Sequence, residues 1–217
     1  MANFTVADVK ALRDKTGAGM MDVKKALDEA DGDIAAAEEI LRVNGMKSIS
    51  KREGRTAANG LVVSAVRDSE DGQRGILIEV NAETDFVAKN EKFIEMTEEI
   101  VEAAIASGAS DVDSLLASEL GGHTVKDRID GMIAIIGEKM EVSHVEVLEG
   151  EHVEAYMHRT NPDLPPQVGV LVATDKGAAS VAHDIAVHNE ALAPSYQNSE
   201  TVQQDVVYNE TLIETET

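Results

Sequence analysis

The stretch Asn81–Asn90, NAETDFVAKN, decides the fold because the secondary structure changes across it. The apolar run before it, Gly75–Val80, predicts a strand, and the apolar pattern after it predicts a helix that ends at Gly108. The stretch is therefore a strand-to-helix connection. Segments of this kind lie on the surface of a rigid scaffold, and functional side chains tend to collect in them.

An aromatic ring stands next to a carboxylate in the middle of this connection, at Asp85 and Phe86. The chain has only three Phe, three Tyr and no Trp, so a ring at a turn needs a specific reason. Phe86 is either a staple into the local core or an anchor for a partner. Residue types alone favour the staple, since an aromatic near a helix start usually belongs to the core.

The composition indicates a folded protein with true cores, at 43% hydrophobic residues in a chain of 217. No apolar run approaches the roughly 18 residues of a membrane span, and the first residues, MANFTVADVK, lack the pattern of a secretion signal. Cysteine is absent, which excludes disulfides and thiolate zinc sites. We therefore expect a cytoplasmic protein.

The net charge of −22 is spread unevenly along the chain. Residues 1–59 balance ten basic against ten acidic side chains, whereas residues 140–217 hold two basic and fourteen acidic ones. An acidic body repels phosphate backbones, which argues against DNA as a ligand. Solubility explains the acid better than an acidic binding face does.

The first 45 residues predict a three-helix bundle. The three helices expected are one from the Thr5–Asp8 capping box to Thr16, one over Met21–Ala30 and one over Ile34–Asn44. Val6 and Ile34 are expected to face inward, and Gly45 to end the third helix. Residues 46–59 carry four basic side chains with little apolar pattern and are read as a linker. A solvated tether is favoured there over an RNA contact.

The remaining chain predicts an α+β fold. The expected strands and helices are a hairpin of Leu61–Val66 with Arg74–Val80, helices Asp111–Ala117 and Thr124–Glu138, a second hairpin of Val142–Leu148 with His152–His158, a strand Gln167–Thr174 and a helix Ala178–Leu192. They suggest two α+β halves, residues 60–139 and 140–197, each an antiparallel sheet with helices. Residues 198–217 begin a further helical pattern.

No known catalytic or cofactor-binding pattern is present. The chain has neither a Walker-type loop nor a nucleophile elbow. His183 and His188 are five apart, which does not place them on one helix face as a metal pair requires. The residues therefore predict an interaction protein rather than an enzyme, with no catalytic residue, metal site or cofactor. A hydrolase is disfavoured because no nucleophile has a base at a suitable spacing.

Two segments resemble the signatures of bacterial elongation factor Ts. They are LRDKTGAGMMDVKKAL at Leu12–Leu27 and ETDFVAKN at Glu83–Asn90. The runs MIAIIGEKM at Met132–Met140 and YMH…PQVGVLV at Tyr156–Val172 are also similar to that family. The resemblance covers residues 1 to 196 and implies a guanine-nucleotide exchange factor for elongation factor Tu in translation elongation. It also implies that the partner, and not this chain, binds the nucleotide and magnesium.

The resemblance also assigns roles to individual residues. It implies that residues 1–45 form a bundle similar to ubiquitin-associated domains, which docks on the partner through Arg13, Met20 and Met21. The working element is the turn Thr84-Asp85-Phe86-Val87, whose ring wedges between two helices of the partner's nucleotide domain while the acid acts near the magnesium and phosphate site. His158 matches a further contact position. With the resemblance, the anchor becomes the favoured reading of Phe86.

The end of the chain departs from the family pattern. The family continues into a helical hairpin and a C-terminal module, whereas this sequence stops at Thr217, within what should be the first hairpin helix. Binding to elongation factor Tu is expected to remain, with weakened exchange as one outcome. The alternative is a protein-binding module that uses the three-helix bundle, with exchange activity lost through the shortened C-terminus. Replacing Phe86 separates the two, because only exchange depends on the ring.

Overall fold

A computed structural model describes residues 3–16, 18–52 and 54–194. In chain order the elements are α1 Val6–Thr16, α2 Met20–Glu29, α3 Ile34–Arg52, β1 Asn59–Ser69, β2 Gly72–Ala82, α4 Asp85–Ala88, α5 Glu91–Ser107, α6 Val112–Leu116, β3 Glu119–Leu120, β4 His123–Thr124, α7 Val125–Ile136, β5 Met140–Gly150, β6 His152–His158, β7 Val168–Thr174, the 3-10 turn η1 Ala179–Val181 and α8 Ala182–Leu192. The fold is mixed helix and antiparallel sheet, as predicted.

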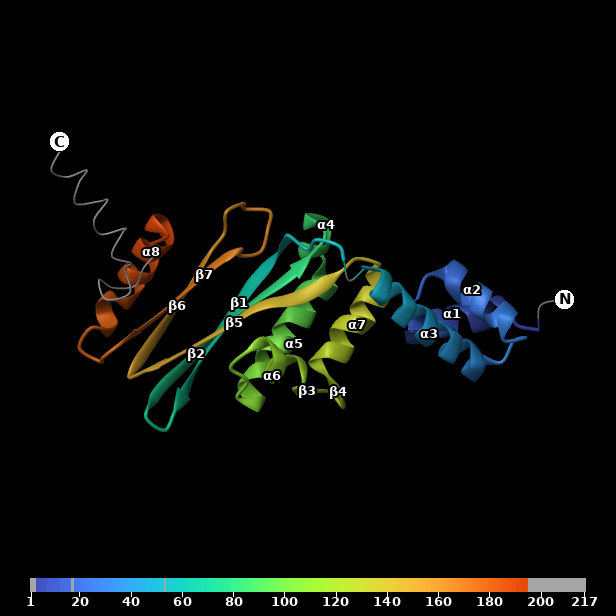
Figure 1. Ribbon diagram of the computed structural model, residues 1–217, viewed down its shortest axis with the longest axis horizontal. Coiled ribbons are helices and arrows are strands. Elements are labelled where there is room, and N and C mark those ends of the chain that lie inside the picture. The colour runs from blue at the N-terminus through green and yellow to red at the C-terminus, as the bar shows by residue number, and fades with distance from the viewer. Residues whose placement is uncertain (1–2, 17, 53, 195–217) are drawn as a thin grey trace.

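Helices α1, α2 and α3 form the N-terminal bundle around a small core of their own (Figure 1). The capping box is present, since Thr5 and Asp8 exchange hydrogen bonds between side chain and backbone. Two expected core residues are exposed: Val6 is 87% exposed and Ile34 45%. Each is the first residue of its helix, and Phe4, just before α1, packs against this core.

Helix α3 does not end at Gly45 but continues to Arg52, through half of the expected linker. Gly45 has no positive φ, so it does not act as a left-handed C-cap. A Cβ on Gly45 would lie 3.2 Å from the Cβ of Ala134 on α7, so this glycine permits a close approach of two helices. Further along α3, Ile49 packs against the main core.

The main sheet has the strand order β1-β2-β5, and every pairing in it is antiparallel. The β1–β2 hairpin occurs where it was predicted, with longer strands. The predicted second hairpin is wrong, because β5 pairs with β2 and not with β6. Without β5, β2 would be an edge strand with unpaired backbone groups, and the buried Val142 and Val145 of β5 complete the core of the main sheet.

Strands β6 and β7 form a second, two-stranded sheet that packs on the main one. The approach is close: a Cβ added at Gly75 of β2 would lie 2.6 Å from Val153 Cγ1 of β6. Figure 1 shows the resulting layers, with α8 outside the β6–β7 sheet, then the main sheet, then α5, α6 and α7 on its far side. The N-terminal bundle lies beyond α7.

The helices on the far side of the main sheet begin and end at residues whose types favour helix ends. Asn90 caps α5 and Gly108 ends it in the left-handed conformation. Asp111, where the sequence predicted the helix to begin, is the N-cap of α6. Helix α7 begins with a Thr124–Asp127 capping box and ends at Ile136, before the left-handed Gly137. The predicted helix extended to Glu138, which in the structure lies outside α7.

The division into domains remains a prediction, although α3 crosses the expected boundary after residue 45. The pairing of β5 with β2 also joins the two expected α+β halves in one sheet. The expected helical start at 198–217 lies outside the described residues.

The contact between the sheets yields a stability prediction at Gly75. Replacing it with alanine should destabilise the protein by about 1–3 kcal/mol, because the new methyl group meets the stiff, buried Val153. Urea unfolding of Gly75→Ala and the parent protein measures this difference.

A matched glycine-to-alanine change provides the control. Gly131 on α7 faces open space, so Gly131→Ala should raise the free energy of unfolding by up to about 1 kcal/mol. Equal stability of the two variants would contradict the close packing of the sheets.

Candidate functional site

The connection between β2 and α5 contains a short helix, α4, that the sequence did not reveal. Thr84 is its N-cap and accepts a hydrogen bond from the Val87 N–H at 3.4 Å. Four residues without an apolar repeat give no periodic signal, and the only cue was Thr84 followed by Asp85. Figure 1 shows α4 at the upper end of the main sheet.

The Phe86 ring is not a staple into the local core, because 79% of the residue is exposed. Val87 and Ala88, which follow the ring in α4, are buried and hold the helix against the scaffold. The aromatic ring that fills the core near this turn is that of Phe93 on α5, which is fully buried. Of the described aromatic residues, Phe86 is the only one in the set of exposed large hydrophobic residues. An anchor for a partner requires a ring exposed in this way.

Asp85 lies next to the ring and stays near the surface. Its carboxylate accepts a hydrogen bond from Lys89 Nζ at 3.0 Å, an i, i+4 pair along α4. Both side chains are partly exposed, so the pair contributes little stability. The carboxylate therefore remains available to a partner at a small cost in free energy.

Two carboxylates on neighbouring strand ends fix the residues before α4. Glu138 accepts hydrogen bonds from the Thr84 N–H at 3.1 Å and from Thr84 Oγ1 at 2.9 Å. In return, Glu83 accepts one from the Lys139 N–H at 2.7 Å. We call this reciprocal arrangement of Glu83 and Glu138 the cross-clasp.

Arg55, which lies between α3 and β1, and Asn59, the first residue of β1, strengthen the cross-clasp. Arg55 pairs with the Glu83 carboxylate at 3.1 Å, and Asn59 Nδ2 donates to the Glu83 carbonyl at 2.8 Å. The hydrogen bond from the Lys139 N–H lowers the pKa of Glu83 below its ordinary value, and the bond from Arg55 lowers it further. The hydrogen bonds of the cross-clasp are therefore strongest when Glu83 is ionised.

The N-terminal residues predicted to touch a partner are all exposed, and we refer to these three residues as the N-terminal patch. Arg13 is exposed at the end of α1, and Met20 and Met21, at the start of α2, are 59% and 76% exposed. Neither methionine belongs to the bundle core. Methionine side chains are flexible and polarisable, so two of them together can adapt to an apolar surface.

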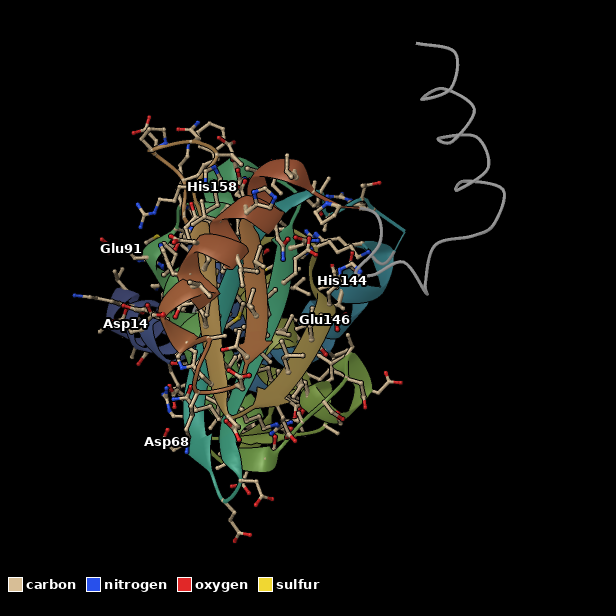
Figure 2. All side chains as sticks on the ribbon, turned by 90° about the vertical axis from the view of Figure 1, so that its left-hand side faces the viewer. Asp14, Asp68, Glu91, His144, Glu146 and His158 are labelled. Carbon is tan, nitrogen blue, oxygen red and sulfur yellow. The ribbon has the colours of Figure 1, made fainter. Side chains whose placement is uncertain are left out.

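His158 lies at the end of β6, where the chain turns into the loop before β7 (Figure 2). Its Nδ1 is 3.1 Å from the Tyr156 hydroxyl, and its Nε2 is 3.7 Å from a Glu190 oxygen on α8. The following loop and Lys89, at the end of α4, line one groove of about 510 Å³. The structure thus brings the α4 turn and the His158 loop to one side, whereas Arg13 and the methionines lie on the separate bundle.

The described part of the chain holds no group of three or more potential metal ligands. Of the helices in residues 3–16, 18–52 and 54–194, none is both long and apolar enough to cross a membrane.

Sequence reasoning missed Glu138 as a supporting residue because it extended α7 over it. The glycine at 137 was the available signal, since a glycine after an apolar helical run commonly ends the helix. The pairing of Glu138 with Thr84 follows from the register of β5 on β2, in which Ala82 faces Met140 and which was not predicted.

Comparison with known proteins places the chain among the translation elongation factors. The family model described as Elongation factor TS matches residues 83–217. Relatives named Elongation factor Ts include those of Beutenbergia cavernae, 55% identical, Micrococcus luteus, 54%, and an Arthrobacter species, 51%. Each match covers 100% of this chain and 78% of the relative. The chain belongs to the elongation factor Ts family.

The lowered pKa of Glu83 predicts a pH-dependent contribution to stability. A carboxyl group with a depressed pKa in the folded state stabilises fully above its unfolded value, here 4.5, and loses that contribution as pH falls through the folded value. Urea unfolding at several pH values between about 3 and 7 should show Glu83→Gln less stable than the parent at neutral pH, with the gap closing below about 4.5. A gap that stays constant over this range would contradict the account.

Proposed function

We propose that this protein is a guanine-nucleotide exchange factor that releases GDP from elongation factor Tu, acting in the cytoplasm during translation elongation. The observation that carries the proposal is the exposed Phe86 ring on a turn that is otherwise buried and hydrogen-bonded. The family membership supplies the partner. The protein acts by binding alone, without catalytic residues, metal or cofactor of its own, and the partner holds the nucleotide and magnesium.

The binding energy of the ring comes from removing an exposed aromatic side chain from water. An aromatic buried at the centre of an interface contributes about 2 kcal/mol or more when it fills a pocket. The scaffold holds α4 in place before binding, so little conformational freedom of this turn is lost on association. The ring therefore enters between two helices of the partner's nucleotide domain as a preformed wedge.

Exchange follows from a difference in affinity between two states of the partner. If the ring fits only when those helices have moved apart, the protein binds nucleotide-free elongation factor Tu more tightly than the GDP form. By linkage, it then weakens GDP binding by the same factor. Asp85 acts near the magnesium site, where a displaced metal leaves the β-phosphate charge of GDP uncompensated.

The exposed N-terminal patch and His158 supply affinity at other points of the partner. Arg13, Met20 and Met21 dock on the nucleotide domain, and His158 contacts a different domain of elongation factor Tu. Contacts of this kind bind both states alike and raise the local concentration of the wedge, whereas the ring discriminates between the states.

Phe86→Ala should lower the rate of GDP release at saturating protein by about 30-fold, the factor that corresponds to about 2 kcal/mol. Stopped-flow release of fluorescent GDP from elongation factor Tu measures the rate. Leu192→Ala is the matched control, since Leu192 is a large apolar residue, 64% exposed, on α8 in the outer layer. Exchange at the parent rate by Phe86→Ala would refute the proposal and leave a binding module that uses the bundle.

The Met20→Ala, Met21→Ala double variant should behave differently. We expect the protein concentration at half-maximal rate to rise about tenfold, because two flexible apolar contacts are lost. The maximal rate should stay near that of the parent, since the ring is intact. A fall in the maximal rate with no change in the half-maximal concentration would show that the patch does not serve as a docking contact.

A further inference from the structure

We infer that Glu138 is a positioning residue for exchange: it acts through Thr84 to fix the direction in which α4 presents the Phe86 ring. The inference rests on the proposed function and extends it to a residue 52 positions away from the ring in the chain. Glu138 is half-buried and its carboxylate is hydrogen-bonded to Thr84, so we assign it a positioning role and not that of a partner contact.

The geometry of the strand ends carries the inference. The β2–β5 ladder ends at the pair Ala82 and Met140. Beyond that pair, side chains continue the hydrogen bonding: Glu83 accepts from the Lys139 N–H and Glu138 from the Thr84 N–H. Both backbone donors therefore keep a partner while the strands separate and the chain turns into α4.

Thr84 links this pairing to the helix. Its hydroxyl group donates to the Glu138 carboxylate, and the hydroxyl oxygen accepts from the Val87 N–H. The same group therefore ties the cross-clasp to the first turn of α4. Helix α4 has only four residues and cannot hold its direction by its own hydrogen bonds. Its direction is set by Glu138 through Thr84 at one end and by the burial of Val87 and Ala88 beneath it.

Loss of the Glu138 carboxylate should leave the fold in place and release the start of α4. Glu138→Ala removes both acceptors of Thr84, and a wedge displaced by about 1 Å works far less well. Glu138→Gln keeps one acceptor oxygen and supplies an amide that can donate to the Thr84 hydroxyl oxygen. The alanine variant should exchange about tenfold more slowly than the parent protein, and the glutamine variant within about threefold of it.

A double-mutant cycle with Phe86→Ala tests whether Glu138 acts through the ring. If it does, Glu138→Ala added to Phe86→Ala slows stopped-flow GDP release by less than about twofold, although it costs about tenfold alone. Amide hydrogen exchange supplies a second readout, in which the Thr84 N–H should exchange faster in Glu138→Ala and return towards the parent rate in Glu138→Gln. Glu102→Ala, which removes a carboxylate paired with Arg67, is the control and should change neither readout.

Three results would overturn the inference. One is exchange at the parent rate by Glu138→Ala, and another is a full tenfold loss added to that of Phe86→Ala. The third is unchanged protection of the Thr84 N–H. Each leaves the proposed function standing if Phe86→Ala alone is slow, whereas parent-like exchange by Phe86→Ala refutes the proposed function itself.

Discussion

The antiparallel pairing of β2 with β5 is the constraint on which the rest of the structure depends. It closes the main sheet, completes the core beneath α5 and α7, and sets Glu83 and Thr84 beside Glu138 and Lys139. Because the last ladder pair fixes the distance between these segments, the two carboxylates can take over the backbone donors where the ladder stops. The short helix that follows then has a defined direction, and the exposed ring on it has a defined place.

The division between buried and exposed residues in α4 shows how a stable scaffold can carry an unfavourable surface group. An exposed phenylalanine contributes nothing to folding and leaves apolar area in water. Its neighbours Val87 and Ala88 are buried and Thr84 is hydrogen-bonded, so the turn remains ordered without the ring's help. In the proposed function, burial of this ring in the partner supplies binding free energy.

Much of this organisation could be predicted from the sequence. The capping box at Thr5, the hairpin of strands 61–66 and 74–80 and the helix after Asn90 all follow from local chemistry, and the structure confirms them. The turn 84–87 was singled out by a scarce ring beside an acid. Residue types alone favoured a ring packed into the local core, and that reading was wrong. Exposure depends on which neighbour fills the core, and here Phe93 does so.

The predictions that the structure contradicts concern contacts between segments that are distant in the sequence. A glycine such as Gly45 can end a helix or allow another helix to approach, and only the presence of Ala134 distinguishes the two. The strand 142–148 has the same apolar pattern whether it pairs with β6 or β2, so its register and the role of Glu138 could not be derived. These features depend on how the layers assemble, which local patterns do not encode.

The most direct test of the central claim is to compare affinities for the two states of the partner. Calorimetric titration of nucleotide-free and of GDP-bound elongation factor Tu with this protein gives both dissociation constants. The account predicts tighter binding to the nucleotide-free form, by the same factor by which the protein weakens GDP binding, and a much smaller ratio for Phe86→Ala. Equal affinity for the two forms would contradict it, because a protein that does not discriminate between them cannot shift the nucleotide equilibrium.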